Sequence, residues 1–478
     1  MGKLDRLGKK DAAKIRDEMQ RAVTPAVGRI GTGPLKTKKN PTLTTYEGAP
    51  AWQPKLKTEL FQLAVSNMVG EGTFYEKAGD RDARFTALVH KVAVKDPVWM
   101  LHFVKWLRGD ANMRTASIVA AAEGVAARLD AGCGSTLEVT LLPKLGANLV
   151  TNRKIIDAAL QRADEPGELL AYWLANHGRN VPKPVKRGLA DAATRLYNEY
   201  TLLKYDTASH GVRFGDVLDL VHPTPATPDQ GALFKYAIDR RHGHDDGVPE
   251  GLPMVRANYH FRESYRHGNV AIPDAETLRA AGMTWEDVLS LLGSKVDKAK
   301  LWEAMIPNMG VMATIRNLKN FDEAGVSDVA AAKVIARLTD PAQIAKSRQL
   351  PFRFYTAYTQ APSDRWKHAL GVALDLACAN VPALPGRTLV LIDTSASMTN
   401  CTISEKSTVT AAQAAAVLGI VLAKRCGAEV HGWATGTYRH DLVKGQNAMQ
   451  GVEAFLKRTG EAGHGTDIRQ ALRLYNGH

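Results

Sequence analysis

A short apolar run that ends in an aspartate and is followed by two serines constrains the fold of this chain more than any other feature. The run is Leu389-Val-Leu-Ile-Asp393, and Ser395 and Ser397 follow the aspartate at the second and fourth positions. Such a run is typical of a buried parallel strand, and open α/β sheets place their ligand sites at the carboxyl ends of such strands. One carboxylate and two hydroxyls offer only oxygen ligands, which hard cations prefer. We therefore predict a divalent cation site, with Mg²⁺ as its ion.

The residues around this run alternate between strand and helix patterns. We expect a helix over 407–424, a strand over 428–434 and a helix over 448–457. This alternation indicates an α/β fold with a doubly wound sheet. The alternative explanation for the two serines is a helix N-cap that holds no metal.

The pattern Asp-x-Ser-x-Ser resembles the metal-ion-dependent adhesion site of von Willebrand factor A domains. The resemblance implies that the loop around His464 supplies the hydroxyl of Thr466 as a fourth ligand, with Asp467 as a lesser candidate. An A domain typically adds an aspartate from a later strand, and the sequence ends at His478 before such a strand. We therefore expect a von Willebrand factor A-like module over 383–478 that is incomplete at its C-terminus.

Residues 55–380 have a helical apolar period almost throughout, interrupted by breakers such as Asp96-Pro97 and Pro182-Lys-Pro184. The residues expected to cap helix N-termini are Asp274, Thr284, Ser294 and Ser327. Many helices without an evident sequence repeat predict an irregular α-solenoid, which we assign to 45–382. Solenoids offer extended curved surfaces, so binding is the expected function.

The charge of the chain favours a polyanionic partner. Lys and Arg number 62 against 49 Asp and Glu, which gives a net charge of +13. Nucleic acid is the first candidate and an acidic membrane surface the second. Residues 1–44 are expected to form a basic arm that attracts phosphates, or else a solvated tail.

The cysteines and the apolar runs constrain the compartment. Cys133, Cys378, Cys401 and Cys426 are too widely spaced for a zinc knuckle or a disulfide framework, which fits a reducing cytosol. No stretch approaches 18 consecutive apolar residues, so no membrane span is expected. We predict a cytoplasmic protein.

A helical solenoid followed by an Asp-x-Ser-x-Ser module resembles the Ro autoantigen family, whose helical part is called the TROVE module. The segments that carry the resemblance, in family order, are 84–108, 186–223, 302–321 and 373–398. The resemblance implies a ring of HEAT-like helices closed by the A-like module. It also implies binding of small structured Y RNAs and of single-stranded ends of misfolded RNA, and in bacteria a ring-shaped exoribonuclease tethered through the RNA.

The resemblance places RNA contacts at basic residues near the start of one helix. The first candidates are Lys183, Lys186 and Arg187, because clustered cations at a helix start hold phosphates. The further candidates are Arg213, His222 and Arg316, with Lys319 as a weaker one. Phe214 stands where some relatives carry a histidine, and an aromatic ring there could stack on a base. The basic run 239–244 is a phosphate patch or balances its own charge with nearby aspartates.

Three classes of function remain in competition. The first is an RNA-binding scaffold in RNA quality control or processing, and DNA is not expected as its ligand. The second is a metal-dependent module that binds a partner protein. The third is an enzyme, which we do not expect, because metal nucleases need several clustered carboxylates and Asp393 is the one sure carboxylate of the site.

Overall fold

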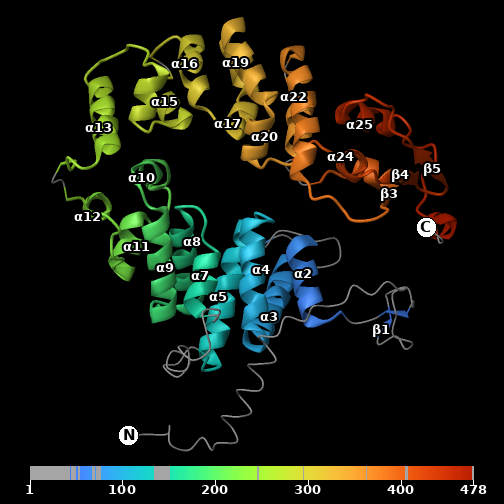
Figure 1. The fold of residues 1–478 in the computed structure, drawn as a ribbon, viewed down its shortest axis with the longest axis horizontal. Helices are drawn as coiled ribbons and strands as arrows, with labels where there is room; N and C mark the ends of the chain where they lie inside the picture. The colour runs from blue at the N-terminus through green and yellow to red at the C-terminus, as the bar shows by residue number, and fades with distance from the viewer. Residues whose placement is uncertain are drawn as a thin grey trace, which may run out of the picture. The chain divides into compact units, whose positions relative to one another are not determined.

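A computed structural model describes residues 43–44, 50–51, 54–66, 70, 77–133, 151–244, 247–293, 295–361, 363–403 and 407–475 (Figure 1). Packing divides the chain into unit 1, Met1–Ala257, and unit 2, Asn258–His478. Most of the predicted basic arm lies outside the described residues. In the described part of the chain, no helix is long and apolar enough to cross a membrane.

The described part of unit 1 is helical apart from a short antiparallel pair, β1 (Leu43–Thr44) with β2 (Pro50–Ala51). Its helices are α2 (Leu56–Ser66), α3 (Ala78–Lys95), α4 (Pro97–Gly109), α5 (Arg114–Asp130), α7 (Asn152–Ala158), α8 (Glu165–His177), α9 (Lys183–Leu196), α10 (Glu199–Tyr205), α11 (Phe214–Val221) and α12 (Pro228–His242). The helix α13 (Pro253–Arg266) crosses into unit 2. Neighbouring helices pack in pairs, with α3 on α5, α7 on α9 and α11 on α12, as in a solenoid.

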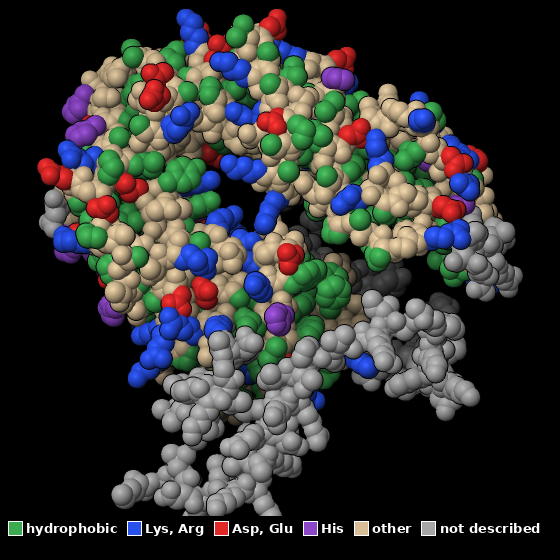
Figure 2. Space-filling view, in the orientation of Figure 1, with side chains coloured by type: hydrophobic (Ala, Val, Ile, Leu, Met, Phe, Trp, Pro, Cys, Tyr) green, Lys and Arg blue, Asp and Glu red, His purple; other side chains and the backbone are tan. Residues whose placement is uncertain are grey.

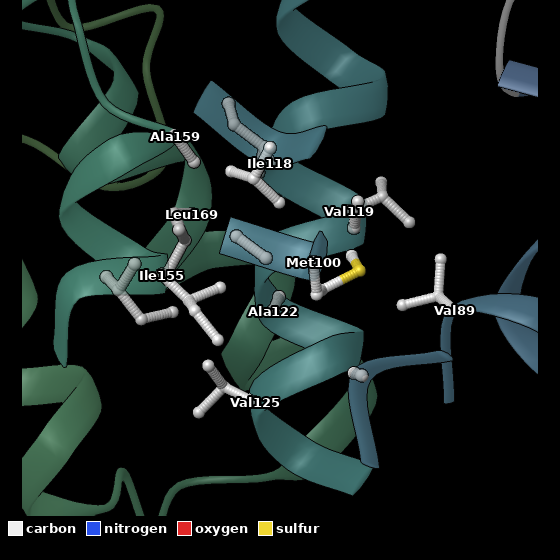
Figure 3. Close-up of a cluster of buried hydrophobic side chains, with 14 of the residues drawn as sticks. Val89, Met100, Ile118, Val119, Ala122, Val125, Ile155, Ala159 and Leu169 are labelled. Carbon is white, nitrogen blue, oxygen red and sulfur yellow. The ribbon is translucent and has the colours of Figure 1, made fainter. Parts of the chain in front are cut away.

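The core of unit 1 is centred on α5, whose small residues let neighbouring helices approach closely. Ala120, Ala121 and Ala122 have no exposed surface, and a Cβ on Gly124 would lie 3.3 Å from the Cβ of Ala93 in α3. Figure 3 shows side chains of α3, α4, α5, α7 and α8 meeting around this helix. The alanine-rich pattern is therefore a packing feature.

Unit 2 begins with helices and ends with an α/β module. Its helices before the module are α14 (Ala275–Ala280), α15 (Trp285–Leu292), α16 (Lys298–Met305), η3 (Ile306–Asn308), α17 (Val311–Arg316), α18 (Leu318–Ala324), α19 (Asp328–Leu338), α20 (Pro341–Ser347), α21 (Pro351–Thr359), α22 (Asp364–Ala377) and η4 (Cys378–Asn380). Three predicted N-caps are confirmed: Asp274, Thr284 and Ser327 each accept a backbone N–H of the helix that follows. Ser294 lies outside the described residues.

The α/β module contains a sheet in the order β3-β4-β5. Its elements are β3 (Leu389–Asp393), α23 (Ala396–Asn400), α24 (Ala411–Cys426), β4 (Glu429–Trp433), β5 (Thr437–His440), α25 (Ala448–Leu456) and α26 (Ile468–Tyr475). The strands β3 and β4 are parallel, which confirms the α/β prediction. The expected helix over 407–424 starts later, because Thr410 forms a capping box with Gln413. The antiparallel strand β5 was not predicted.

The α/β module packs on the last helices before it. Asp375 of α22 accepts the backbone N–H of Ala448 at the start of α25 at 2.7 Å and lies 2.9 Å from the Lys424 ammonium of α24. Arg425 donates to the carbonyl of Val381 at 2.8 Å. The predicted limit at 382/383 coincides with the change from helices to strands, whereas packing joins both sides into unit 2. The limits of the predicted domains stay a prediction.

Candidate nucleic-acid interface

The predicted cations Lys183, Lys186 and Arg187 lie in the first two turns of α9. Pro182 is the N-cap and a proline follows in the first turn, where a missing N–H costs no helical hydrogen bond. Val185, on the inner face, has no exposed surface. The amphipathic pattern of α9 therefore turns its charged residues outward.

An open pocket of about 650 Å³ lies between α7, α9 and the C-terminal end of α11. The residues that line it are Arg153, Asp157, Lys186, Arg187, Ala190, Asp191, Thr194, Arg195, Val221, His222, Pro223 and Thr224. The structure thus brings together the predicted residues Lys186, Arg187 and His222. Lys183 is exposed one turn earlier on the same helix. Two arginines of the pocket, Arg153 and Arg195, were not predicted.

Both of these arginines are paired with carboxylates of the same pocket. Arg153 donates to both oxygens of Asp191, with 2.5 Å between Nη2 and Oδ1, and this hydrogen bonding raises the pKa of Arg153. Arg195 Nη2 lies 2.6 Å from Asp157 Oδ1 and 2.8 Å from the carbonyl of Leu160. The pairs fix the guanidinium groups and largely neutralise them.

Lys186 and Arg187 supply the uncompensated positive charge of the pocket. Neither side chain forms a salt bridge with any residue that the structure describes. Arg187 is exposed and Lys186 is half-buried. Figure 2 shows lysine and arginine side chains spread widely over the visible surface. What distinguishes the pocket is therefore the combination of a hollow with two unpaired cations.

His222 stands at the rim of the pocket in an uncommon backbone conformation. Its φ is 46° and its ψ is 60°, in the left-handed region that non-glycine residues rarely adopt. It ends α11, and its N–H donates to the carbonyl of Leu218 at 2.9 Å. Since Pro223 follows, a right-handed helical conformation is disfavoured at this position. The exposed imidazole is thus held beside the cations of α9.

Arg213 and Phe214 are engaged within the protein. The Arg213 guanidinium pairs with the buried carboxylate of Asp206, which also accepts the N–H of Phe214 at 3.0 Å. The Phe214 ring is 3% exposed and stacks on Tyr197 with 3.8 Å between centroids. Neither side chain is therefore presented to a ligand in this arrangement.

The basic run 239–244 is balanced by carboxylates of α11. Arg241 lies 2.7 Å from Asp216, and His242 lies 2.5 Å from Asp219. The aspartates at 245 and 246 lie outside the described residues. These pairs join the end of α12 to α11.

Arg316 belongs to unit 2, at the last turn of α17, and is exposed. The neighbouring Asn317 is 1% exposed and donates to the carbonyl of Ala313 at 2.9 Å, which is a structural role. Lys319 lies 3.6 Å from Glu323 on the same helix. The contact of Arg316 with RNA stays a prediction.

The predicted metal ligands gather at the carboxyl ends of β3 and β4. Asp393 Oδ1 accepts the N–H of Ser395 at 2.8 Å, and the hydroxyl oxygens of Ser395 and Ser397 are 3.2 Å apart. The carbonyl of His464 accepts the N–H of Ala396 at 3.2 Å, so the loop that carries Thr466 lies against this turn. Thr466 is exposed.

This donor set fits a hard divalent cation, because it combines one carboxylate with hydroxyl oxygens on adjoining loops. Asp467 is a weaker candidate, since its carboxylate pairs with Arg469 at 3.0 Å and its N–H binds the carbonyl of Ala434. Over the described ranges, no group of three or more His, Cys, Asp or Glu side chains is placed to hold a metal ion. The cation stays a prediction.

Comparison with known proteins finds one matching domain family and relatives that are similar to parts of the chain. Residues 279–368 match the TROVE domain. The chain is 26% identical over 385 residues to the RNA-binding protein RO60 of Deinococcus radiodurans, and the match covers 74% of this chain and 65% of that protein. A segment of 77 residues, 16% of this chain and 3% of the relative, is 42% identical to telomerase protein component 1 of Mus musculus.

The fold agrees with a solved relative. The crystal structure of the Deinococcus radiodurans Ro (Rsr) protein matches with a TM-score of 0.58 at 19% identity, covering 83% of this chain and 79% of that one. This agreement supports a helical solenoid followed by a small A-like α/β module. The TROVE match and the Ro relative support the resemblance of this chain to the Ro/TROVE family, and the fold agrees with it.

Proposed function

We propose that this protein binds structured RNA at the α9 pocket. The proposal rests on one observation: the same open pocket is lined by two uncompensated cations, Lys186 and Arg187, and by His222. Cations that replace counterions around phosphates supply most of the sequence-independent affinity for nucleic acid. The relative in Deinococcus radiodurans is itself described as an RNA-binding protein.

Within this proposal, the RNA is a small noncoding Y-like RNA, and the protein acts in the cytoplasm as a ribonucleoprotein scaffold in RNA quality control or processing, without catalysis of its own. A ring-shaped exoribonuclease would be tethered through the RNA. Sequencing of the RNA that co-purifies with the full chain tests the identity of the RNA. Loss of the nuclease from the complex on mild RNA digestion tests whether the RNA tethers it.

The test of the pocket is the triple change of Lys183, Lys186 and Arg187 to Gln. We expect weaker binding of a structured RNA, and a salt dependence whose slope falls by roughly 2 to 3, since each lost phosphate contact removes a little under one. The matched control changes the exposed lysines Lys298, Lys300 and Lys333 to Gln, which removes the same charge elsewhere. Equal losses in both variants would reject the pocket.

A second proposed activity is binding of a divalent cation at Asp393, Ser395, Ser397 and Thr466. A partner protein would offer a carboxylate that completes the coordination of this cation. The cation site is favoured by the 3.2 Å approach of the two serine hydroxyls beside the Asp393 carboxylate. Mg²⁺ should raise the thermal unfolding midpoint of the natural protein and not that of Asp393→Ala. The control is Asp364→Ala, an exposed aspartate paired with Lys367. An unchanged response in Asp393→Ala would exclude this site.

A further inference from the structure

A second surface of unit 1, on α10, combines exposed aromatic rings with positive charge. Asn198 caps this helix by accepting the N–H of Thr201 at 2.9 Å, and Leu202 anchors it with no exposed surface. Tyr200 and Lys204, four residues apart, share one face of the helix, because such residues are neighbours on a helix surface. Tyr200 is 45% exposed and Lys204 is exposed.

Cations and rings alternate across this surface. The Lys204 ammonium lies 5.6 Å from the centroid of the Tyr200 ring and 5.2 Å from that of Tyr205. The Arg162 guanidinium lies 5.4 Å from the centroid of Tyr205. These are cation–π distances, and they fix the order Arg162, Tyr205, Lys204, Tyr200.

The charge of Lys204 is not neutralised. Arg162 is paired with Asp164, with 2.6 Å between Nε and Oδ1, whereas Lys204 forms no salt bridge with a carboxylate in the described ranges. Other lysines of the chain, such as Lys424 beside Asp375 at 2.9 Å, have such a partner. Lys204 is therefore positioned to bind an anion next to an open ring.

We propose that Tyr200, Lys204 and Tyr205 form a contact for single-stranded RNA, in which the Tyr200 ring stacks on an unpaired base and Lys204 binds the adjoining phosphate. The inference rests on RNA binding as the proposed function. Proteins that bind single strands combine cations with aromatic platforms in this way. Base faces within a duplex are covered by neighbouring bases, so a ring of this kind selects unpaired nucleotides. The aliphatic residue Leu202 faces inward, so it is not available to a protein or membrane partner.

The experiment compares two RNAs by fluorescence anisotropy with the full chain: a uridine decamer, whose bases hardly stack on one another, and a stable hairpin without single-stranded ends. For Tyr200→Leu we expect roughly tenfold weaker binding of the decamer, as for loss of one stacked base, and binding of the hairpin within twofold of the natural protein. Tyr200→Phe, which keeps the ring face, should bind the decamer like the natural protein. Lys204→Gln should lower the salt slope for the decamer by about 0.7.

The matched control is Tyr259→Leu. Tyr259 is 51% exposed and meets His260 edge-on at 5.6 Å, and among the residues the structure describes no lysine or arginine lies over its ring. Decamer binding that is unchanged in Tyr200→Leu, or equally reduced in Tyr259→Leu, would overturn the proposal. If the natural protein binds the hairpin but not the decamer, only the proposed α10 contact is overturned. If it binds neither RNA, the proposed function is overturned as well.

Discussion

Gly188 of α9 lies so close to Ile156 of α7 that no side chain fits between them. A Cβ on Gly188 would stand 2.6 Å from the Ile156 Cβ and 2.9 Å from the carbonyl oxygen of Arg153. Because α7 carries Arg153 and α9 carries Lys186, this contact sets the width of the pocket between the two helices.

Gly188→Ala should therefore lower both stability and RNA affinity. Overpacking of this kind costs about 1–3 kcal/mol, and it would move α7 and its arginine away from α9. The control is Gly79→Ala in α3, where nothing lies within 4 Å of the added Cβ. There the change should leave stability equal or raise it by up to about 1 kcal/mol. Urea midpoints and RNA titrations measure the two effects, and equal midpoints in both variants would contradict the close contact.

Asp191→Asn should strengthen RNA binding. The change removes a negative charge from the pocket and releases Arg153 from its paired carboxylate, so one more guanidinium can contact a phosphate. Because both side chains are substantially exposed, at 51% and 34%, the loss of the pair should cost little stability. We expect a several-fold gain in affinity and a steeper salt dependence. A loss of affinity would mean that Asp191 positions Arg153 for binding.

His222→Gly should lower the RNA affinity without lowering the stability of the fold. Glycine adopts the left-handed region freely, so the change relieves a backbone cost of roughly 1 kcal/mol while removing the imidazole from the pocket. The thermal midpoint should stay equal or rise, and RNA affinity should fall. His222→Ala keeps the strain and should lose affinity alone. If affinity is unchanged in both variants, His222 has no part in binding.

Glu123 in α5 joins three helices through polar contacts. Its Oε2 lies 2.7 Å from Nε2 of His90 in α3, and its Oε1 accepts the Tyr172 hydroxyl of α8 at 2.8 Å and lies 3.1 Å from Nε2 of His177. Burial alone raises the pKa of Glu123, but the hydrogen bonds of His90 and Tyr172 and the charges of both histidines outweigh it. The pKa therefore ends below its ordinary value of 4.5.

A lowered carboxyl pKa means that the folded state holds its proton less tightly than the unfolded state does. The stability that Glu123 contributes is complete above about pH 4.5 and is lost as the pH falls through the lowered pKa. Glu123→Gln should thus cost about 2 kcal/mol at pH 6.5 and less at pH 3.5, which lies below the ordinary carboxyl pKa of 4.5. Urea midpoints at the two pH values measure this, and an equal cost at both would refute the ionic role.

The sequence predicted the helical solenoid and the α/β module because both depend on local patterns. The period of apolar residues identifies helices such as α9, and the polar caps Asp274, Thr284 and Ser327 mark helix starts. The strand β5 was missed because Thr437–His440 is short and follows β4 after only a tight turn.

The candidate pocket was predictable only in part. Lys186 and Arg187 are neighbours in sequence, and Arg195 is a further cation about two turns along the same helix. Arg153 could not, since only the packing of α7 on α9 brings it there. Sequence likewise gives no sign that Phe214 is buried under Tyr197, which is a tertiary contact.

The bond from Asp375 to the start of α25 bears on how such proteins diverge. A single carboxylate of α22 holds both α24 and α25, the two helices that frame the α/β sheet. An exchange of this module between relatives at residue 382 would remove the native partners of that carboxylate and the packing of α22 against α25. The segment that relatives can exchange without loss of folding is therefore longer than the segment with A-like sequence. It would have to include α21 and α22.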